Sequence, residues 1–466
     1  MVGIFFEAIK TDRSVLKPNP MKTHIQWIII LALAGLFPAR AMAQQDTLTL
    51  QDVLSRALKQ NKQLEIARMQ SRKAEYATRE AQSNLFPEIE AYGKMEDYLK
   101  LPVLIIPGEM LGAPGENVPV QFGTQYNVEG GLQLRQLLFN QSYWTSLRLS
   151  KKMEQIQELG IEQTREEVFY ELARLYYLSH ATQGQIELLK RNMARLDTIY
   201  RLTEVQLNQD MIRRVDLEKI EVRRNNLQVE LEGLQTLWNR QIRTISQLAG
   251  LRDKKPIVFD KQDLCRPVTS SRPQNNEDHP ELLLQHRKTE LEALQLKSQK
   301  QAYLPTLTGF GRFNYQAQRD ELDMFQSDGD KWSQIAVVGV NLQVPLFDGF
   351  NRRAGIQKAR VSLDQAKVKE SQIREKLEMQ QMNAAGKYRQ KKKDLSSQQS
   401  NVALAQKVFA IHKTQYHNGM ISLTELLQAE SDLSYTQGKK LESLLQLRLA
   451  ELELLQSQGM LQSLLN

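Results

Sequence analysis

The chain of 466 residues contains one cysteine, Cys265. A single cysteine excludes an intrachain disulfide, so noncovalent packing must supply the stability of the fold. Beyond the amino-terminal segment, the chain also lacks an apolar run of about eighteen residues, which argues against a helical membrane anchor in its body. Aromatic residues make up only 7% and apolar residues 41% of the chain. We therefore expect long, partly solvated helices rather than one large core.

Proline is absent from two long windows, residues 120–255 and 346–466, although the chain contains fourteen prolines. Because proline breaks helix interiors, these windows are the places where very long helices can form. A helix from about Asn351 to Tyr416 would be roughly 100 Å long. Leucines recur at spacings of three and four within the second window, which predicts that one side of each helix packs against neighbouring helices.

The motifs of enzymes are also missing from the sequence. Cys265 has no neighbouring cysteine or histidine at a zinc-binding spacing. His412 and His417 are five residues apart, a poor spacing for one metal ion on a helix, and the other histidines are scattered. There is no phosphate-binding loop, dinucleotide fingerprint or nucleophile elbow. We therefore expect no enzymatic activity, no cofactor and no metal site, and the net charge of +8 over the chain is weak evidence for nucleic-acid binding.

The amino terminus has the pattern of an export signal. Met21-Lys22 precedes an apolar run at residues 25–37, and Ala41-Met42-Ala43 supplies small residues before Gln44. This pattern predicts a secretory signal peptide within residues 1–43, with translation starting at Met21. Residue 44 is glutamine, so lipid attachment to a new amino-terminal cysteine is not expected.

The remainder of the chain is an internal duplication. Asn208-Gln209-Asp210-Met211-Ile212 recurs as His417-Asn418-Gly419-Met420-Ile421, 209 residues later. Upstream, Asn61 aligns with His279 at an offset of 218, so the first copy holds about ten additional residues. We place these between Leu99 and Val120, where four prolines and three glycines predict a surface loop without regular structure.

Between the helical windows the apolar pattern changes to a period of two, which is typical of strands. Alternation runs from Gln121 to Leu134, and in the second copy from Leu307 to Gln316 and from Trp332 to Val344; a partner from Ile89 to Tyr98 is less regular. About fourteen residues are enough to cross a bilayer as a tilted strand. Four strands cannot close a barrel and an open edge cannot lie in lipid, so three copies with twelve strands are expected. The alternative is two surface hairpins on a soluble helical protein.

Breaks at Asp210 and Gly419 divide each long window into two antiparallel helices, since these residue types tolerate the left-handed conformation of a helix-ending turn. We therefore expect a leader at residues 1–43, a first repeat at 44–251, a linker at 252–278 and a second repeat at 279–466. The first repeat would contain a short helix, a β-hairpin at about 88–138 and a helical hairpin at about 140–250. The second would contain a helix, a β-hairpin at about 306–345 and a helical hairpin at about 348–463.

The sequence resembles a known family, the TolC-like outer-membrane efflux proteins, over nearly all of the mature chain. The resemblance rests on Leu48–Val53 with Ala57-Leu58 and Asn61, on Leu346–Gly349, and most specifically on Tyr416–Glu430. It implies a mixed α and β fold in which a homotrimer forms a twelve-stranded outer-membrane β-barrel. The barrel continues as a long periplasmic tube of helices, girdled by a belt that would include residues 252–278.

The same resemblance implies function and partners. Such proteins are passive exit ducts for small molecules and drugs, anchored in outer-membrane lipid. They act with a periplasmic adaptor (membrane fusion) protein and an inner-membrane transporter that supplies the energy. Two alternatives stay open: the duct of a type I protein secretion system, and a periplasmic coiled-coil adaptor or scaffold that does not enter the membrane.

Candidate site residues follow from the resemblance at the two helical turns, which would form the periplasmic tip. Family members carry acidic side chains six and nine residues after the turn glycine, here Gly419, and these positions hold Glu425 and Gln428. We expect a cation-attracting ring of Glu425; the alternative is a solvated glutamate on a helix face.

The family's latch at this tip joins a tyrosine before the turn to an arginine after it. Tyr416 is present but Ile421 replaces the arginine, while Asp216 is retained in the first repeat with Arg213 beside it, close to the turn residue Asp210. We therefore expect packing and other ion pairs to hold the closed state.

Overall fold

The computed structural model of the chain describes residues 49–107, 117–251, 276–322 and 332–465, together with Gly112 and Gly115. The expected leader at residues 1–43 lies outside the described residues. So does most of the expected linker, residues 252–275.

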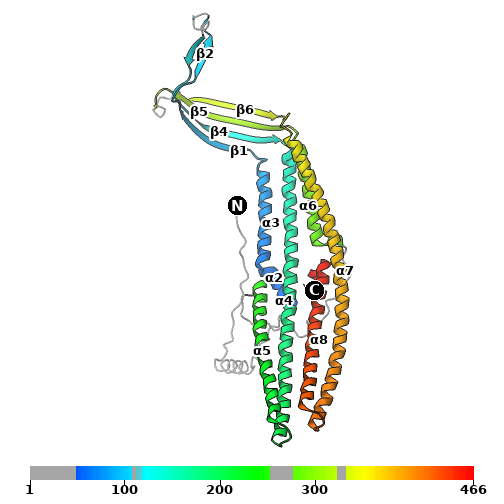
Figure 1. Ribbon diagram of the computed structural model, residues 1–466. Helices are drawn as coiled ribbons and strands as arrows, with labels where there is room; N and C mark the ends of the chain where they lie inside the picture. The colour runs from blue at the N-terminus through cyan, green and yellow to red at the C-terminus, as the bar shows by residue number, and fades with distance from the viewer. Residues whose placement is uncertain are drawn as a thin grey trace, which may run out of the picture. The chain divides into compact units, whose positions relative to one another are not determined.

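Long helices, a four-stranded antiparallel sheet and a two-stranded antiparallel sheet make up the described chain (Figure 1). The elements of the first half are α2 (Leu50–Gln60), α3 (Lys62–Ser83), β1 (Glu88–Asp97), β2 (Val103–Pro107), β3 (Asn117–Gln121), β4 (Tyr126–Phe139), α4 (Gln141–Leu207) and α5 (Arg214–Leu248). Those of the second half are the short 3₁₀ helix η2 (Asn276–Asp278), α6 (Pro280–Gln301), β5 (Thr306–Arg319), β6 (Ser333–Gln343), α7 (Asn351–His417), α8 (Leu423–Ser457) and the 3₁₀ helix η4 (Leu461–Leu465).

The lengths of the helices repeat between the two halves. Both α3 and α6 have 22 residues, both α4 and α7 have 67, and both α5 and α8 have 35. At about 1.5 Å per residue, α4 and α7 are each about 100 Å long. The predicted mixed, internally duplicated fold is confirmed. Within the described residues, no helix combines the length and apolar composition that a membrane crossing demands.

The four long strands form a single sheet in the order β1-β4-β5-β6, and every neighbouring pair is antiparallel. The two expected hairpins are therefore joined through the β4–β5 ladder, in which Tyr126 lies opposite Arg319 and Leu134 opposite Gly311. Strands β1 and β6 are the two edges of this sheet.

One predicted strand was displaced by five residues. The alternation of apolar and polar residues predicts a strand from Gln121 to Leu134, but β4 spans Tyr126–Phe139. Gly123 adopts a φ of +110°, a conformation that L side chains rarely adopt, so the backbone bends where the side-chain pattern continued without a break.

The predicted loop between Leu99 and Val120 was also wrong, because it contains the antiparallel pair β2–β3. Pro119 pairs with Ile105, and Pro107 ends β2 opposite Asn117. Proline is tolerated in edge strands, where its missing N–H leaves no ladder partner unsatisfied. In a two-stranded sheet both strands are edges, so the prolines did not exclude a hairpin.

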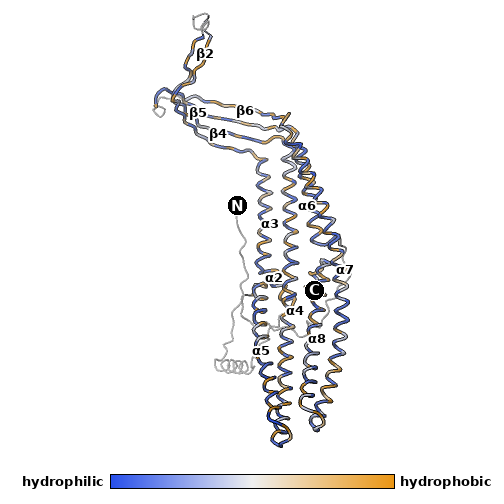
Figure 2. Tube along the Cα trace, viewed as in Figure 1, coloured by the Kyte–Doolittle hydropathy of each residue, from blue (hydrophilic) through white to orange (hydrophobic). Residues whose placement is uncertain are grey.

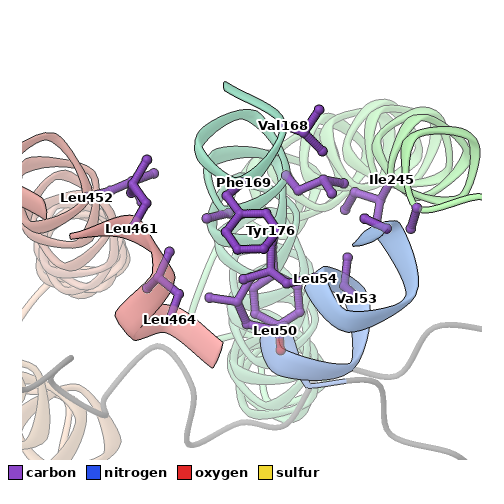
Figure 3. Close-up of a cluster of buried hydrophobic side chains, with 14 of the residues drawn as sticks. Leu50, Val53, Leu54, Val168, Phe169, Tyr176, Ile245, Leu452, Leu461 and Leu464 are labelled. Atoms are coloured by element: carbon purple, nitrogen blue, oxygen red, sulfur yellow. The ribbon is translucent and has the colours of Figure 1, made fainter. Parts of the chain in front are cut away.

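The principal hydrophobic cluster lies where helix ends meet α4 (Figure 3). Leu54 of α2, Phe169 and Tyr176 of α4, and Ile245 of α5 are completely buried there, and Leu461 of η4 closes the cluster. Burial of a large apolar side chain contributes about 1.5–3 kcal/mol, so this cluster anchors the helix ends. Elsewhere the helices alternate polar and apolar residues along their length (Figure 2), as expected for helices with one packed side.

Two equivalent contacts, one in each repeat and called joints here, connect helix ends in this region; they are formed by Asn61 and by His279. Asn61 begins α3 by accepting hydrogen bonds from the N–H groups of Gln63 and Leu64, and its Nδ2 donates to the Leu248 carbonyl at 2.7 Å. In the second repeat His279 occupies the same place: Nδ1 accepts from the Glu281 N–H, and Nε2 lies 3.2 Å from the Gln456 carbonyl. One residue thus caps a short helix and binds the end of the returning helix.

His279 makes the second joint sensitive to pH. Burial lowers the pKa of the His279 imidazole below its usual 6.5, and Lys376 adds to that effect, while the Gln456 carbonyl and Glu281 oppose it. The unfolded chain binds a proton more readily than the folded chain below pH 6.5, so this joint loses stability as the pH falls from 6.5 towards the lowered value. Above pH 6.5 both states are neutral and the contribution is complete.

We expect His279→Asn, which copies Asn61, to make the protein less sensitive to acid. The thermal unfolding midpoint at about pH 7.5 and about pH 5.5 should fall less for this variant than for the parent. Burial raises the pKa of the nearby Glu166 to about 7, which stabilises the folded state in acid and is common to both proteins. The reciprocal Asn61→His should increase the acid sensitivity; equal pH dependence in all three proteins would contradict this role.

Candidate functional site

The two helical turns share one backbone geometry. Asp210 and Gly419 both adopt left-handed conformations, with φ values of 57° and 70°. The next residue in each turn reaches back to the helix: the Met211 N–H donates to the Gln206 carbonyl and the Met420 N–H to Gln415. These bonds form the same helix-ending motif twice. Glycine adopts the left-handed conformation without a steric penalty. Aspartate, here Asp210, pays some penalty but tolerates this conformation better than most residue types.

The returning helices begin differently after the two turns. Ser422 and Glu425 form a reciprocal cap: the Ser422 hydroxyl accepts from the Glu425 N–H, and the Glu425 carboxylate accepts from the Ser422 N–H at 2.8 Å. Arg213, in the equivalent place before α5, has no side-chain cap. Instead Asp216 lies in the first turn of α5 and binds Lys219 at 2.9 Å. A cap contributes about 1 kcal/mol, so the second turn is the more firmly fixed.

Tyr416 lies beneath the second turn and is 3% exposed. Its hydroxyl lies 3.1 Å from the Thr203 hydroxyl of α4, which ties the two repeats together near their turns. Burial raises the pKa of Tyr416, and the Asp216 carboxylate raises it further, while the Thr203 bond acts in the opposite sense. Tyr416 and Asp216 are therefore near each other, but the hydrogen-bond partner of Tyr416 is Thr203, a residue that the sequence did not single out.

Glu425 and Gln428 both lie on the exposed side of α8. Gln428 donates to Asp432 at 2.9 Å, and Asp432 continues the same side one turn further. The hydrogen bonds from Ser422 lower the pKa of Glu425, so its carboxylate is charged at neutral pH. The expected glutamate therefore has two features at once: it caps α8 and it presents an exposed negative charge.

The structure contains a buried cluster of charged residues that the sequence analysis did not predict. Glu430 of α8 is only 2% exposed, and its carboxylate lies 3.2 Å from Arg195 of α4 and 3.7 Å from Arg223 of α5. Ser434 donates to the same carboxylate at 2.7 Å, and Arg223 also donates to the Leu427 carbonyl at 2.9 Å. One carboxylate thus joins three helices from both repeats.

A sequence signal for Glu430 was present. Leu423, Leu426, Leu427 and Leu433 are all buried at helical spacing, and Glu430 occupies the gap in that stripe. A charge in an apolar stripe must find partners, because an unpaired buried charge is costly. The partners lie on other helices, so the sequence alone does not identify them. Among the described residues, no group of three or more acidic, histidine or cysteine side chains is placed to hold a metal ion.

The sheet has two chemically different faces. Residues opposite one another in the register share a face, so Ile89, Leu134 and Val338 lie on one side and Glu90, Gln133 and Arg312 on the other. The first, called here the apolar face, carries Ile89, Met95, Val128, Leu132, Leu134, Phe313, Tyr315, Val338, Val340 and Leu342, with Asp97, Gln136, Arg319 and Gln334 as polar exceptions towards its ends. The polar face carries Glu88, Glu90, Lys94, Glu129, Gln133, Arg135, Arg312, Asn314 and Gln316, with Leu137, Phe310, Ile335 and Val337 as exceptions.

The apolar face is uncovered in the single chain. Val338 is 90% exposed, Val340 66% and Ile89 65%. An exposed apolar surface of this kind marks a site of contact with a membrane or another protein. The opposite face is held by polar contacts: the Glu129 carboxylate accepts from the Tyr92 hydroxyl at 2.6 Å and from Asn314 at 2.8 Å.

Comparison with protein families gives a match over both repeats. The model described as "Outer membrane efflux protein" matches residues 53–251 and 276–460. Among curated proteins, the chain is 20% identical over 315 residues to the outer membrane efflux protein BepC of Brucella suis biovar 1 (strain 1330). The match covers 66% of this chain and 68% of BepC.

Several solved structures have a similar fold and superpose on most of this chain. CusC superposes with a TM-score of 0.73 at 15% identity, covering 88% of this chain and 92% of CusC. VceC of Vibrio cholerae gives a TM-score of 0.70 at 15% identity, with 88% and 96% coverage. The open state of the MtrE channel of Neisseria gonorrhoeae gives 0.70 at 14% identity, with 88% coverage of both chains. These likenesses establish the fold.

We expect Glu430→Gln to lower the free energy of unfolding by about 3 kcal/mol, because it removes the charge that neutralises two partly buried arginines. The matched control is Glu221→Gln, at the equivalent position of the first repeat, where the glutamate is exposed and accepts a hydrogen bond from the Tyr200 hydroxyl. That change should alter stability by no more than about 0.5 kcal/mol. Denaturant unfolding followed by helical signal measures both, and similar losses would contradict the assigned role.

Proposed function

Because the chain belongs to the outer membrane efflux protein family, we propose that it is the passive outer-membrane exit duct of a tripartite efflux pump for small molecules. The observation that carries the proposal is the sheet with one exposed apolar face, continued by two helices about 100 Å long. Lipid is a suitable cover for that face, and the helices are long enough to extend far into the periplasm.

Three copies of the chain form this duct in our proposal. Strands β1 and β6 are edges of the four-stranded sheet, and an unpaired edge is costly in lipid because its N–H and C=O groups have no partners. Joining β1 of one copy to β6 of the next satisfies both edges. Three such junctions would close twelve strands into a barrel, with the apolar face outward and the polar face lining the lumen.

The helical turns would then lie at the far end of the tube, in the periplasm. We propose that this tip meets a periplasmic adaptor and, through it, an inner-membrane transporter that supplies the energy. Contacts between the repeats near the tip support a role in holding it closed: Tyr416 binds Thr203, and Glu430 binds Arg195 and Arg223. Opening the tip would separate helices that these contacts join.

Reconstitution in a planar bilayer tests the proposal directly. We expect the purified protein to be trimeric and to insert as a channel with small, discrete and cation-preferring conductance steps, because a narrow acidic mouth concentrates cations. A soluble monomer that never inserts would contradict the proposal and would favour an adaptor or scaffold.

The ring of Glu425 predicts a change in selectivity at the tip. Glu425→Gln should reduce the preference for cations, measured as the reversal potential in a salt gradient, because each copy loses one exposed negative charge. The matched variant Gln428→Glu adds a charge one turn away and should increase the preference. In the parent, cation preference should also fall as the pH drops through the lowered pKa of Glu425. Unchanged reversal potentials in both variants would leave Glu425 with the capping role alone.

A further inference from the structure

The β2–β3 hairpin continues the main sheet at the end away from the helices. Strand β1 follows α3 directly and β4 leads directly into α4, so Asp97 and Tyr126 lie at the opposite end. Beyond them, the Tyr98 N–H donates to the Gln125 carbonyl and the Phe122 N–H to the Pro102 carbonyl. The β1–β4 pair thus extends past the bend at Gly123 into β2–β3. In the proposed duct, this is the extracellular end.

Both faces of the hairpin are apolar. Leu104 and Val120 are opposite each other on one face, together with Ile106 and Val118. The other face carries Val103, Ile105, Pro107 and Pro119, with Asn117 and Gln121 as polar members at its two ends. Ile105 is 69% exposed, Val103 54% and Leu104 51%. A two-stranded hairpin is marginal in water on its own, so these faces need a cover.

We propose that the β2–β3 hairpins of three copies pack against one another around the symmetry axis and narrow the extracellular mouth. The proposal rests on the trimeric duct proposed above. It follows from continuity with the junction between copies, because the hairpin extends from the edge strand β1, where the next copy would join. Symmetry then brings three hairpins to the same end of the barrel, one from each chain.

Because both faces of the β2–β3 hairpin are apolar, neighbouring hairpins are a better cover for it than lipid. A segment that lies on a membrane has one apolar and one polar face. A hairpin within a ring of three has a neighbour on each side, which suits apolar residues on both faces. The additional residues of the first repeat lie in this region.

Cysteine cross-linking tests the arrangement. The chain has one native cysteine, so Cys265→Ser provides a background without thiols. In this background, Ile105→Cys combined with Val120→Cys should give disulfide-linked dimers and trimers on mild oxidation of the purified trimer, because a ring places the Ile105 face of one hairpin against the Val120 face of the next. The matched control is Val338→Cys, on the apolar face of β6, where it is 90% exposed but would point away from the axis. It should remain uncross-linked.

A second pair of variants tests the effect on the mouth. Leu104→Asp combined with Ile105→Asp should separate the hairpins by charge repulsion and raise single-channel conductance at least twofold. Gln121→Asp adds one negative charge per chain instead of two, at a position that is already polar, and should raise conductance less. A conducting trimer in which the variant with cysteines at positions 105 and 120 neither cross-links nor resists a membrane-impermeant maleimide would overturn the hairpin contact while leaving the duct intact. Failure to form a trimer would instead contradict the proposed function, and this inference with it.

Discussion

The contact between the two repeats along α4 is the constraint on which the rest of the structure depends. Helix α4 packs against α3 and α5 of its own repeat and against α6 and α8 of the other. Helix α7 has no comparable role, because its principal neighbours are α6 and α8. Apolar burial along α4 therefore determines how the two helical hairpins lie side by side. That burial is greatest at the duplicated joints, where Asn61 and His279 attach helix ends to the cluster around Tyr176.

Near the turns the apolar cluster between the repeats is smaller than at the joint, and polar contacts accompany it. The cluster at the joint contains many completely buried side chains, whereas the group around Leu196 and Ile220 near the turns is smaller and lies beside the Glu430 ions and the Thr203–Tyr416 bond. Buried ion pairs gain little net stability but impose specific geometry, because displaced partners leave charges uncompensated. An interface of this kind is suited to two discrete positions, since it resists small displacements and can be separated by a strong partner.

The fold was largely predictable because duplication, proline distribution and apolar period are properties of the chain itself. The turns at Asp210 and Gly419 were predicted for the same reason, as each depends on local backbone preference. The errors came where tertiary geometry overrides a local pattern. Alternation across Gly123 hid a bend, and prolines between Leu99 and Val120 hid a hairpin whose edges tolerate them. Arg195 and Arg223 could not be paired with Glu430 from sequence, because their contacts join helices of different repeats.

The two turns of the duplicated chain differ in structure, and the difference follows from a few residues. The second turn has a glycine at the left-handed position and a complete Ser422–Glu425 cap, so α8 begins rigidly. The first turn has Asp210 in the strained conformation and no side-chain cap at Arg213. A strained, uncapped helix start costs less to displace than a capped one. If the proposed tip opens, we therefore expect α5 to yield at its turn and α8 to move as a unit with Glu425.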